Sequence, residues 1–411
     1  MPLPETCLAH LSSRDGWASG ARPFIERAAT MALDLFLQLG TDATLHPQFI
    51  RTRDAPSMGP ARAVLRDVAA TMDDPDGNFV QQFQTHGFDA RTFELYLQAL
   101  FTEAGHAIDR SRDRPDFLIS RDGLTVAVEA VTANPPPRPD YQPYELYPQV
   151  GPTNAEEAMR FLKHEVAIKI GSPLYSKLQK KYWDLPHVAG RPFVIALENF
   201  HGGGLNMSAN SVSQYLYGID HRHWFDDGGN LVVEGDAVIR HEGSKIIPSN
   251  FFGLPDAVHV SGILFSNTGT IPKFGRIGQQ GAHHSDAVRM VRLGDCWDPD
   301  PNATMSELFA YEVGDPDMPP EPWRDGSVFM RNPNALHPLP DEWIGAGAEE
   351  NLSENGTVIP TFADPFHVYS SQTFLFDGNV PDGAMWDAID HRLEILRMAQ
   401  GLGESWRSEA T

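Results

Sequence analysis

Three carboxylates break the apolar patterns around them, and their positions suggest metal chemistry. Glu94 borders the apolar stripe of a predicted helix. Asp116 opens a short apolar extended run, and Glu129 lies inside the otherwise apolar or small segment 126–132. A charge within a buried strand is unfavourable unless it is paired, hydrogen-bonded or bound to a metal. Converging carboxylates suit Mg²⁺ or Mn²⁺, because these hard ions prefer oxygen ligands.

A lysine is the fourth candidate for this chemistry. In the helix predicted after Ser172, Leu174 and Leu178 set the inward face, and Lys181 lies seven residues after Leu174. At about 100° per residue it is nearly in line with Leu174, whereas Lys177 is about 60° away. We therefore expect Lys181 to face the sheet, where an ammonium group can position an attacking water or stabilise charge on a phosphate oxygen.

These residues lie between positions 88 and 200, where the sequence predicts the order helix, strand, strand, helix, strand. The apolar spacing predicts a helix over 89–104, an extended segment over 114–120 and a strand over 124–132. Asp122-Gly123 is a hairpin signal between the two extended segments. Such a hairpin would bring Asp116 and Glu129 onto adjacent strands.

A second helix is expected after the Pro-rich loop 134–152. The capping-box pattern Thr153-x-x-Glu156 opens it, and Gly171-Ser172-Pro173 interrupts it. Ser172 would cap a new helix with Pro173 at its first position, running to about residue 183. A buried strand over 192–200 would follow.

The remaining parts of the chain carry weaker signals. Residues 1–87 are expected to be a helical extension, with amphipathic stretches over 24–39 and 61–72. Residues 201–411 are expected to be β-rich and of unknown role, ending in a helix over 381–402. The pattern leaves open whether this half is a second domain or an elaboration of the first sheet.

The middle segment resembles the restriction-endonuclease-like superfamily, the PD-(D/E)XK nucleases. The matching residues are Glu94 in Phe-Glu-Leu-Tyr-Leu, the pair Pro115-Asp116, and Glu129 in Val-Glu-Ala-Val. The resemblance covers residues 88–200 and implies an α/β fold with a mixed-sheet core flanked by helices. It also implies a metal-dependent nuclease in which Asp116, Glu129 and Glu94 hold Mg²⁺ or Mn²⁺ and Glu94, Asp116, Glu129 and Lys181 form the catalytic set.

One position departs from the family pattern. The lysine of Glu-x-Lys is replaced by Val131. In this superfamily that lysine can move to a neighbouring element, and Lys181 is our candidate for the migrated group.

The charge of the chain restricts how it could bind nucleic acid. There are 32 Lys and Arg against 55 Asp and Glu, which gives a net charge of −23. A DNA or RNA partner therefore requires a local basic cleft, for which the candidates are Lys177, Lys180, Lys181, Lys273 and Arg276. Lys273 and Arg276 are either loop groups that contact phosphate or ordinary solvated charges.

The expected compartment follows from simpler features. There are two cysteines, so no disulfide framework is expected, and no apolar run is long enough for a membrane span. The first 20 residues lack a signal pattern, so a cytoplasmic protein is expected. The sequence gives no indication of oligomeric state.

Two alternatives remain open at this point. One is a catalytically inactive binding or scaffold protein that keeps the nuclease-like sheet, which the missing Glu-x-Lys lysine and the acidic surface favour. The other is a zinc hydrolase built on histidines of the second half, such as His283, His284 and His367.

Overall fold

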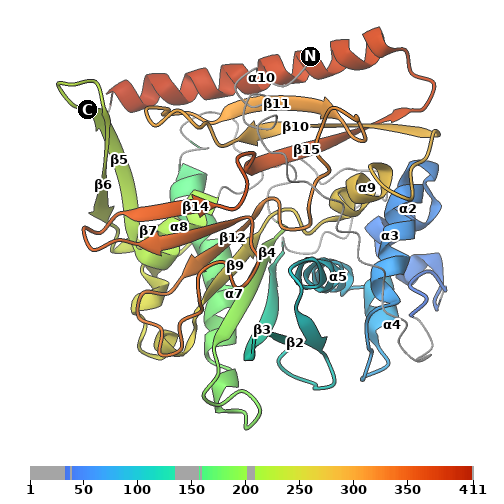
Figure 1. Cartoon of the computed structure of the whole chain (residues 1–411), viewed down its shortest axis with the longest axis horizontal. Coiled ribbons are helices and arrows are strands. Elements are labelled where there is room, and N and C mark those ends of the chain that lie inside the picture. The colour runs from blue at the N-terminus through green and yellow to red at the C-terminus, as the bar shows by residue number, and fades with distance from the viewer. Residues whose placement is uncertain (1–32, 38, 135–156, 158–159, 201–208, 410–411) are drawn as a thin grey trace.

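An eight-stranded mixed sheet forms the centre of the molecule (Figure 1). The computed structural model describes residues 33–37, 39–134, 157, 160–200 and 209–409. The strands follow the order β1-β2-β3-β4-β9-β12-β13-β14. Their bounds are β1 Ala107–Asp109, β2 Phe117–Arg121, β3 Leu124–Ala133, β4 Phe193–Asn199, β9 Gly262–Ser266, β12 Ser327–Arg331, β13 Ala348–Leu352 and β14 Val358–Phe362.

Parallel and antiparallel pairs alternate across this sheet in blocks. β1, β2 and β3 form an antiparallel meander, and β3, β4 and β9 are parallel to one another. β12 runs antiparallel to β9, β13 is parallel to β12, and β14 is antiparallel to β13. The chain is thus a mixed α/β protein, and the expected hairpin and buried strand are both present.

The hairpin between β2 and β3 has the turn that its sequence predicts. Asp122 and Gly123 connect the strands, with φ values of 52° and 79°. Two consecutive residues with positive φ are typical of the tight turn whose twist matches a β-hairpin. This turn fixes the pairing of Phe117 with Val128 and therefore the positions of the residues just beyond that pair.

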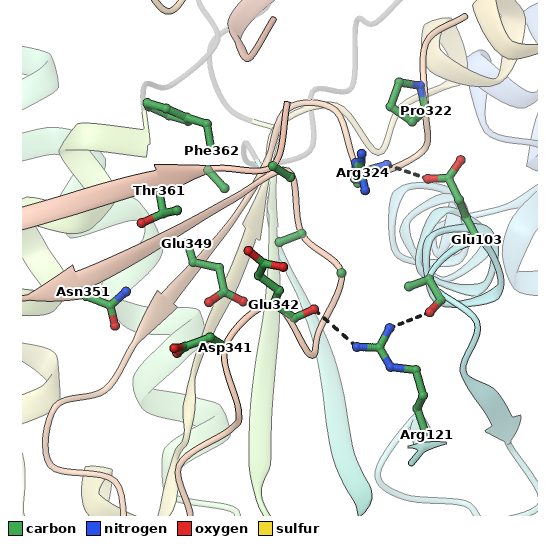
Figure 2. Close-up of a pocket in the computed structure, with 15 residues that line it drawn as sticks. Glu103, Arg121, Pro322, Arg324, Asp341, Glu342, Glu349, Asn351, Thr361 and Phe362 are labelled. Carbon is green, nitrogen blue, oxygen red and sulfur yellow. Dashed lines mark hydrogen bonds between the residues drawn. The ribbon is translucent and has the colours of Figure 1, made fainter. Parts of the chain in front are cut away.

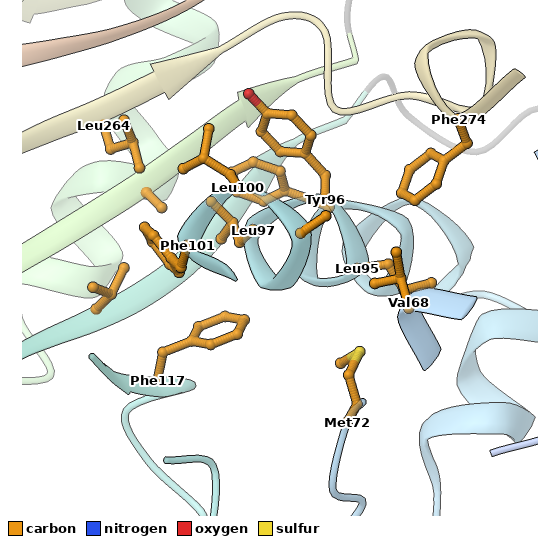
Figure 3. Packing of buried hydrophobic residues seen from close by; sticks show 14 of the residues in the cluster. Val68, Met72, Leu95, Tyr96, Leu97, Leu100, Phe101, Phe117, Leu264 and Phe274 are labelled. Atoms are coloured by element: carbon orange, nitrogen blue, oxygen red, sulfur yellow. The ribbon is translucent and has the colours of Figure 1, made fainter. Parts of the chain in front are cut away.

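Helices cover both faces of the sheet, because alternate strand residues point to opposite sides. One face carries α5 (Phe88–Glu103), whose Leu97, Leu100 and Phe101 pack with Phe117 and Leu264 (Figure 3). The other face carries α7 (Val166–Leu178) and α8 (Ala209–Tyr217), which pack on the intervening strand residues.

The helices before α5 belong to the same hydrophobic cluster as α5. They are α2 (Pro47–Asp54), α3 (Gly59–Ala69) and α4 (Phe79–Gln84), so the expected helix near 61–72 is present. The expected helix over 24–39 lies largely outside the described residues. The described part, 33–37 and 39, contains a turn and no helix.

The expected break at Gly171-Ser172-Pro173 is wrong, because α7 runs through it with Pro173 inside. Gly171 has a packing role instead: a Cβ there would lie 2.9 Å from the hydroxyl of Tyr215, so glycine lets α8 approach closely. The helix then ends at Leu178, five residues earlier than expected. The Pro-rich loop and the capping box of this region lie outside the described residues.

The second half of the chain extends the first sheet and adds another. β9, β12, β13 and β14 continue the central sheet beyond residue 200. An antiparallel sheet of β11 (Glu307–Glu312), β10 (Val288–Cys296) and β15 (Val368–Asp377) packs against the long helix α10 (Asp382–Glu409) (Figure 1). The remaining α-helix and strands of the described residues are α9 (Ile271–Gln279) and the hairpins β5 (Ile219–Phe225) with β6 (Leu231–Ala237) and β7 (Arg240–Glu242) with β8 (Ile246–Pro248).

Among the described residues, no helix combines the length and apolar character that crossing a membrane requires.

Candidate functional site

Asp116 and Glu129 lie opposite each other at the end of the β2–β3 pairing. Phe117 pairs with Val128 in this antiparallel hairpin. Asp116, one residue earlier, therefore lies opposite Glu129, one residue later. An Asp116 carboxylate oxygen accepts a hydrogen bond of 2.8 Å from the backbone N–H of Ala130. Glu129 is only 4% exposed. The hairpin therefore places two carboxylates side by side, as the spacing in the sequence predicts.

The electrostatic environment of Asp116 favours its protonated form. Burial, followed by the negative charges of Glu94 and Glu129, raises the pKa of Asp116 to about 8. The ammonium group of Lys177 opposes this shift but does not cancel it. Asp116 therefore lies close enough to both Glu94 and Glu129 to be repelled by them, and a cation at this point would relieve that repulsion.

Lys177 is the lysine that reaches the carboxylates. Its Nζ lies 2.5 Å from Oε1 of Glu129, and its side chain is 25% exposed. It sits one residue before the buried Leu178 on the flank of α7 that faces the sheet. The hydroxyl of Tyr182 also neighbours Glu129, whose charge adds to burial in raising the pKa of that phenol.

The expectation that Lys181 faces the sheet is wrong. α7 ends at Leu178, so extending the helical projection to residue 181 does not apply. Lys181 adopts a left-handed backbone conformation with φ of 50°, and its Nζ pairs with Asp256 at 3.1 Å. Lys177, which the sequence suggested only as a phosphate contact, is therefore the lysine of this segment that contacts Glu129.

Glu94 is present near the site, but its carboxylate is already engaged by arginines. Oε1 accepts from Arg91 at 2.6 Å and Oε2 from Arg110 at 2.5 Å. Arg91 lies one helical turn before Glu94, and Arg110 follows β1. Both carboxylate oxygens of Glu94 are thus paired with arginines, and Glu94 acts as a charge neighbour of Asp116. Its role as a metal ligand remains a prediction.

Lys273 and Arg276 are buried, which corrects their expected role as phosphate contacts. Both are buried beside Glu321, at 3.0 Å for Lys273 and 2.7 Å for Arg276. Lys273 also donates to the backbone oxygens of Pro322 and Asp325. They lie on α9 rather than on a loop, and the burial of that helix's inner face explains the difference.

The histidines considered for zinc are spread over separate environments. His283 pairs with Asp67 at 2.6 Å, and His284 lies 3.2 Å from Asp286. His367 packs against the rings of Phe362 and Tyr369. Within the part of the chain that the structure describes, no group of three or more His, Cys, Asp or Glu residues is placed to hold a metal ion.

The pair of carboxylates fits a magnesium ion better than a zinc ion. Mg²⁺ keeps several waters and uses only one or two protein carboxylates together with substrate phosphates. Oε2 of Glu129 is buried without a hydrogen-bond partner among the described residues, so it is available as a ligand. Asp116 and Glu129 would hold the ion, and Lys177 would remain beside it.

A separate cavity of about 700 Å³ lies near the C-terminal end of α5 (Figure 2). Its main charged groups are engaged within the protein. Arg121 donates to the carbonyls of Ala104 and Trp343 at 2.7 Å each, and Glu103 accepts from two backbone N–H groups. None of the predicted site residues lines it.

Several residues that contact the site carboxylates were not predicted from the sequence. Arg91 carries a local signal, because it lies three residues before Glu94 on the same helix. Arg110 and Tyr182 carry none, because their contacts depend on where the β1–β2 loop and the end of α7 fold in three dimensions.

No protein-family model, curated protein or solved structure matches this chain.

Proposed function

We propose that this protein hydrolyses phosphodiester bonds of nucleic acid with a divalent metal ion held by Asp116 and Glu129. The observation that carries the proposal is the geometry of the β2–β3 hairpin. It sets these two carboxylates side by side, leaves one Glu129 oxygen without a partner among the described residues, and brings the ammonium of Lys177 to the other.

The order of elements supports the same proposal. α5, the strands β1 to β3, α7 and β4 follow one another along the chain, and β1-β2-β3-β4 are neighbours in the sheet. α5 and α7 lie on opposite faces. This arrangement is similar to the core of the restriction-endonuclease-like superfamily that the sequence resembles.

Each residue of the site has a distinct proposed role. When bound, the divalent ion supplies an activated water and offsets the negative charge that develops on the phosphate. Asp116 and Glu129 hold the ion, while Lys177 fixes the orientation of Glu129 and donates to a phosphate oxygen. Arg91 and Arg110 neutralise Glu94, which limits the negative charge that an approaching phosphate meets.

Basic groups around this site provide the local attraction that an acidic protein needs. Exposed Arg112 and Arg114 lie on the loop between β1 and β2, and exposed Lys180 lies just after α7. The carbonyl of Arg114 also contacts His187, farther along the chain after α7, at 2.8 Å. We propose that these exposed cations attract the phosphates of DNA or RNA toward Asp116 and Glu129.

A cleavage assay tests the proposal. Wild type, Asp116→Asn and Asp113→Asn would be incubated with single- and double-stranded DNA and RNA in Mg²⁺, Mn²⁺ or EDTA. Asp113 is an exposed aspartate on the same loop and serves as the control. We expect metal-dependent cleavage by wild type and Asp113→Asn, at least about 100-fold slower with Asp116→Asn. Equal activity of all three proteins, or activity that survives EDTA, would contradict the proposal.

The second candidate is a binding protein that retains this core without catalysis. It is favoured by the engagement of both Glu94 oxygens by arginines. The same assay separates the two: a binding protein retards nucleic acid on a gel and leaves it intact under every metal condition.

A further inference from the structure

A second cavity, of about 450 Å³, opens on the α7 and α8 side of the central sheet, near its β14 edge. Its walls come from α8, the hairpin strand β5, the strands β12 to β14 and the start of β15. Glu350 of β13 lines it, on the same sheet face as the buried Ala348.

This cavity is separate from the proposed metal site. Glu350 and Glu129 lie in one row across the same sheet face, connected through the paired residues Ile195, Ile263 and Met330. Four strand spacings separate the two carboxylates, which is roughly 19 Å. A ligand bound at Glu350 would therefore occupy a site separate from the proposed metal site.

Glu350 is a buried acid without an ion-pair partner among the described residues. It is 6% exposed, and its Oε2 has no hydrogen-bond partner there. The Ser213 hydroxyl hydrogen-bonds to the carboxyl, but burial prevails and raises its pKa to about 7. An uncompensated carboxylate in a cavity is costly unless a ligand supplies the opposite charge.

The other charged groups of the cavity do not compensate Glu350. Lys163 already pairs with Asp220 at 3.1 Å. His221 accepts a hydrogen bond from the Val358 N–H, and burial lowers its pKa. Burial likewise lowers the pKa of His367. These groups leave the cavity with one net negative charge when Glu350 is ionised.

Among the described residues that line this cavity, the buried side-chain atoms left without a hydrogen-bond partner are acceptors. Oε1 of Gln214 is, like Oε2 of Glu350, buried without a partner among the described residues. Ammonium and guanidinium groups carry donors and no acceptors, which matches this pair. A nucleobase edge presents acceptors as well, and these would find no unpaired buried side-chain donor among the described lining residues.

Apolar and aromatic groups make up much of the remaining wall. Phe362, His367 and Tyr369 form a ring cluster, with Phe362 and His367 centroids 4.8 Å apart. Ile219 and Val358 add aliphatic surface. Aromatic faces attract cations, and the volume exceeds what an ammonium or guanidinium group alone would fill.

We propose that this cavity binds a small organic cation whose primary ammonium or guanidinium head donates to Glu350 and Gln214. Its apolar body packs against the wall that includes Phe362. The net charge of −23 adds a general attraction for cations, so specific binding must be separated from it.

Isothermal titration of purified protein with agmatine tests the proposal, with tetraethylammonium as a cation that lacks N–H donors. The variants are Glu350→Gln, Gln214→Met and the control Glu354→Gln, which removes an exposed acid from the β13–β14 turn. We expect saturable agmatine binding by wild type and Glu354→Gln. Binding should be at least tenfold weaker with Glu350→Gln and several-fold weaker with Gln214→Met. Tetraethylammonium should bind at least tenfold more weakly than agmatine.

The outcomes that overturn the proposal are equally definite. Agmatine binding that is unchanged in Glu350→Gln, or absent in folded wild type, would contradict the proposed binding site. Tetraethylammonium binding as tight as agmatine binding would show that the site does not require N–H donors on the cation. Thermal melts identify any variant that fails to fold, and Gln214→Met then carries the comparison. Metal-dependent cleavage should be unchanged in Glu350→Gln.

Discussion

At the scale of single residues, the proposed function depends on which lysine contacts the two carboxylates. Lys177 contacts Glu129, Lys180 is exposed, and Lys181 pairs with Asp256. Three lysines within five residues thus occupy different environments. Substituting each lysine in turn distinguishes a lysine that contacts the carboxylates from lysines that contribute only positive charge.

We predict that Lys177→Met slows metal-dependent cleavage by about 100-fold or more, because Glu129 loses its orienting partner and the phosphate loses a donor. Lys180→Met and Lys181→Met should stay within about threefold of wild type, since each removes only a peripheral charge. Lys177→Arg, which keeps the charge, should restore part of the rate. Single-turnover cleavage measures all four, and circular dichroism checks that they fold. Equal losses for Lys177 and Lys181 would contradict the assignment.

At the scale of elements, the β2–β3 hairpin positions the candidate site. Its turn residue Gly123 has φ of 79° and open space around its Cβ position. The cost of a side chain there is therefore conformational rather than steric.

We predict that Gly123→Ala lowers the free energy of unfolding by about 1–2 kcal/mol, because alanine disfavours positive φ. Gly59→Ala is the matched control: Gly59 has φ of −50° at the start of α3, so the same methyl group should be neutral or slightly stabilising there. Urea unfolding of both variants measures the difference. A Gly123→Ala protein as stable as wild type would show that this turn does not constrain the hairpin.

Local patterns predicted the elements that carry the site, and long-range packing decided the rest. The hairpin turn and the apolar stripe of α5 are coded within a few residues, so Asp116 and Glu129 met as expected. α7 continues through Pro173 and ends at Leu178, earlier than predicted. The predicted position of Lys181 was therefore wrong. The joining of β9 to β4 involves residues more than 60 positions apart, so no local pattern predicts it.

At the scale of the whole molecule, a buried ion-pair cluster connects α9, β10 and the segment before β12. Glu321 contacts Arg276 through both of its oxygens, at 2.7 and 2.9 Å, Lys273 at 3.0 Å and Arg292 at 3.5 Å. These cations hold the pKa of Glu321 well below its usual range, although burial alone would raise it. The cluster links the second sheet to the helices beside the first.

We predict that Glu321→Gln destabilises the protein by about 3–5 kcal/mol, because it leaves buried cations without their counter-charge. Glu312→Gln is the comparison: Glu312 pairs with Arg289 at 2.6 Å but is 29% exposed, so its loss should cost about 1 kcal/mol or less. Denaturant unfolding measures both. Similar losses for the two variants would contradict the special role of the buried cluster.

Buried acids should also give the whole molecule a distinctive pH dependence. Burial raises the pKa of Glu198 to about 8 and that of Glu350 to about 7. Between pH 6.5 and 8 the folded protein therefore binds more protons than the unfolded chain, whose glutamates are ionised. Histidines with lowered pKa, such as His46 and His106, act in the opposite sense but mainly below pH 6.5.

We predict that the free energy of unfolding falls by about 1–2 kcal/mol as pH rises from 6.5 to 8, through Glu198 and Glu350. Asp116 adds to this in the same direction. Glu198→Gln should flatten part of the slope, because a neutral amide does not titrate. Urea unfolding at several pH values in EDTA measures the dependence. Stability that rises with pH across this window would contradict the account.

The most direct test of the central claim is a titration of Mn²⁺ followed by electron paramagnetic resonance. It compares wild type, Asp116→Asn, Glu129→Gln and Asp256→Asn, the last removing an acid that pairs with Lys181 away from the site. We predict a saturable Mn²⁺ site in wild type and Asp256→Asn that is weakened at least about tenfold in the other two. Identical binding curves for all four proteins would contradict the claim that Asp116 and Glu129 form a metal centre.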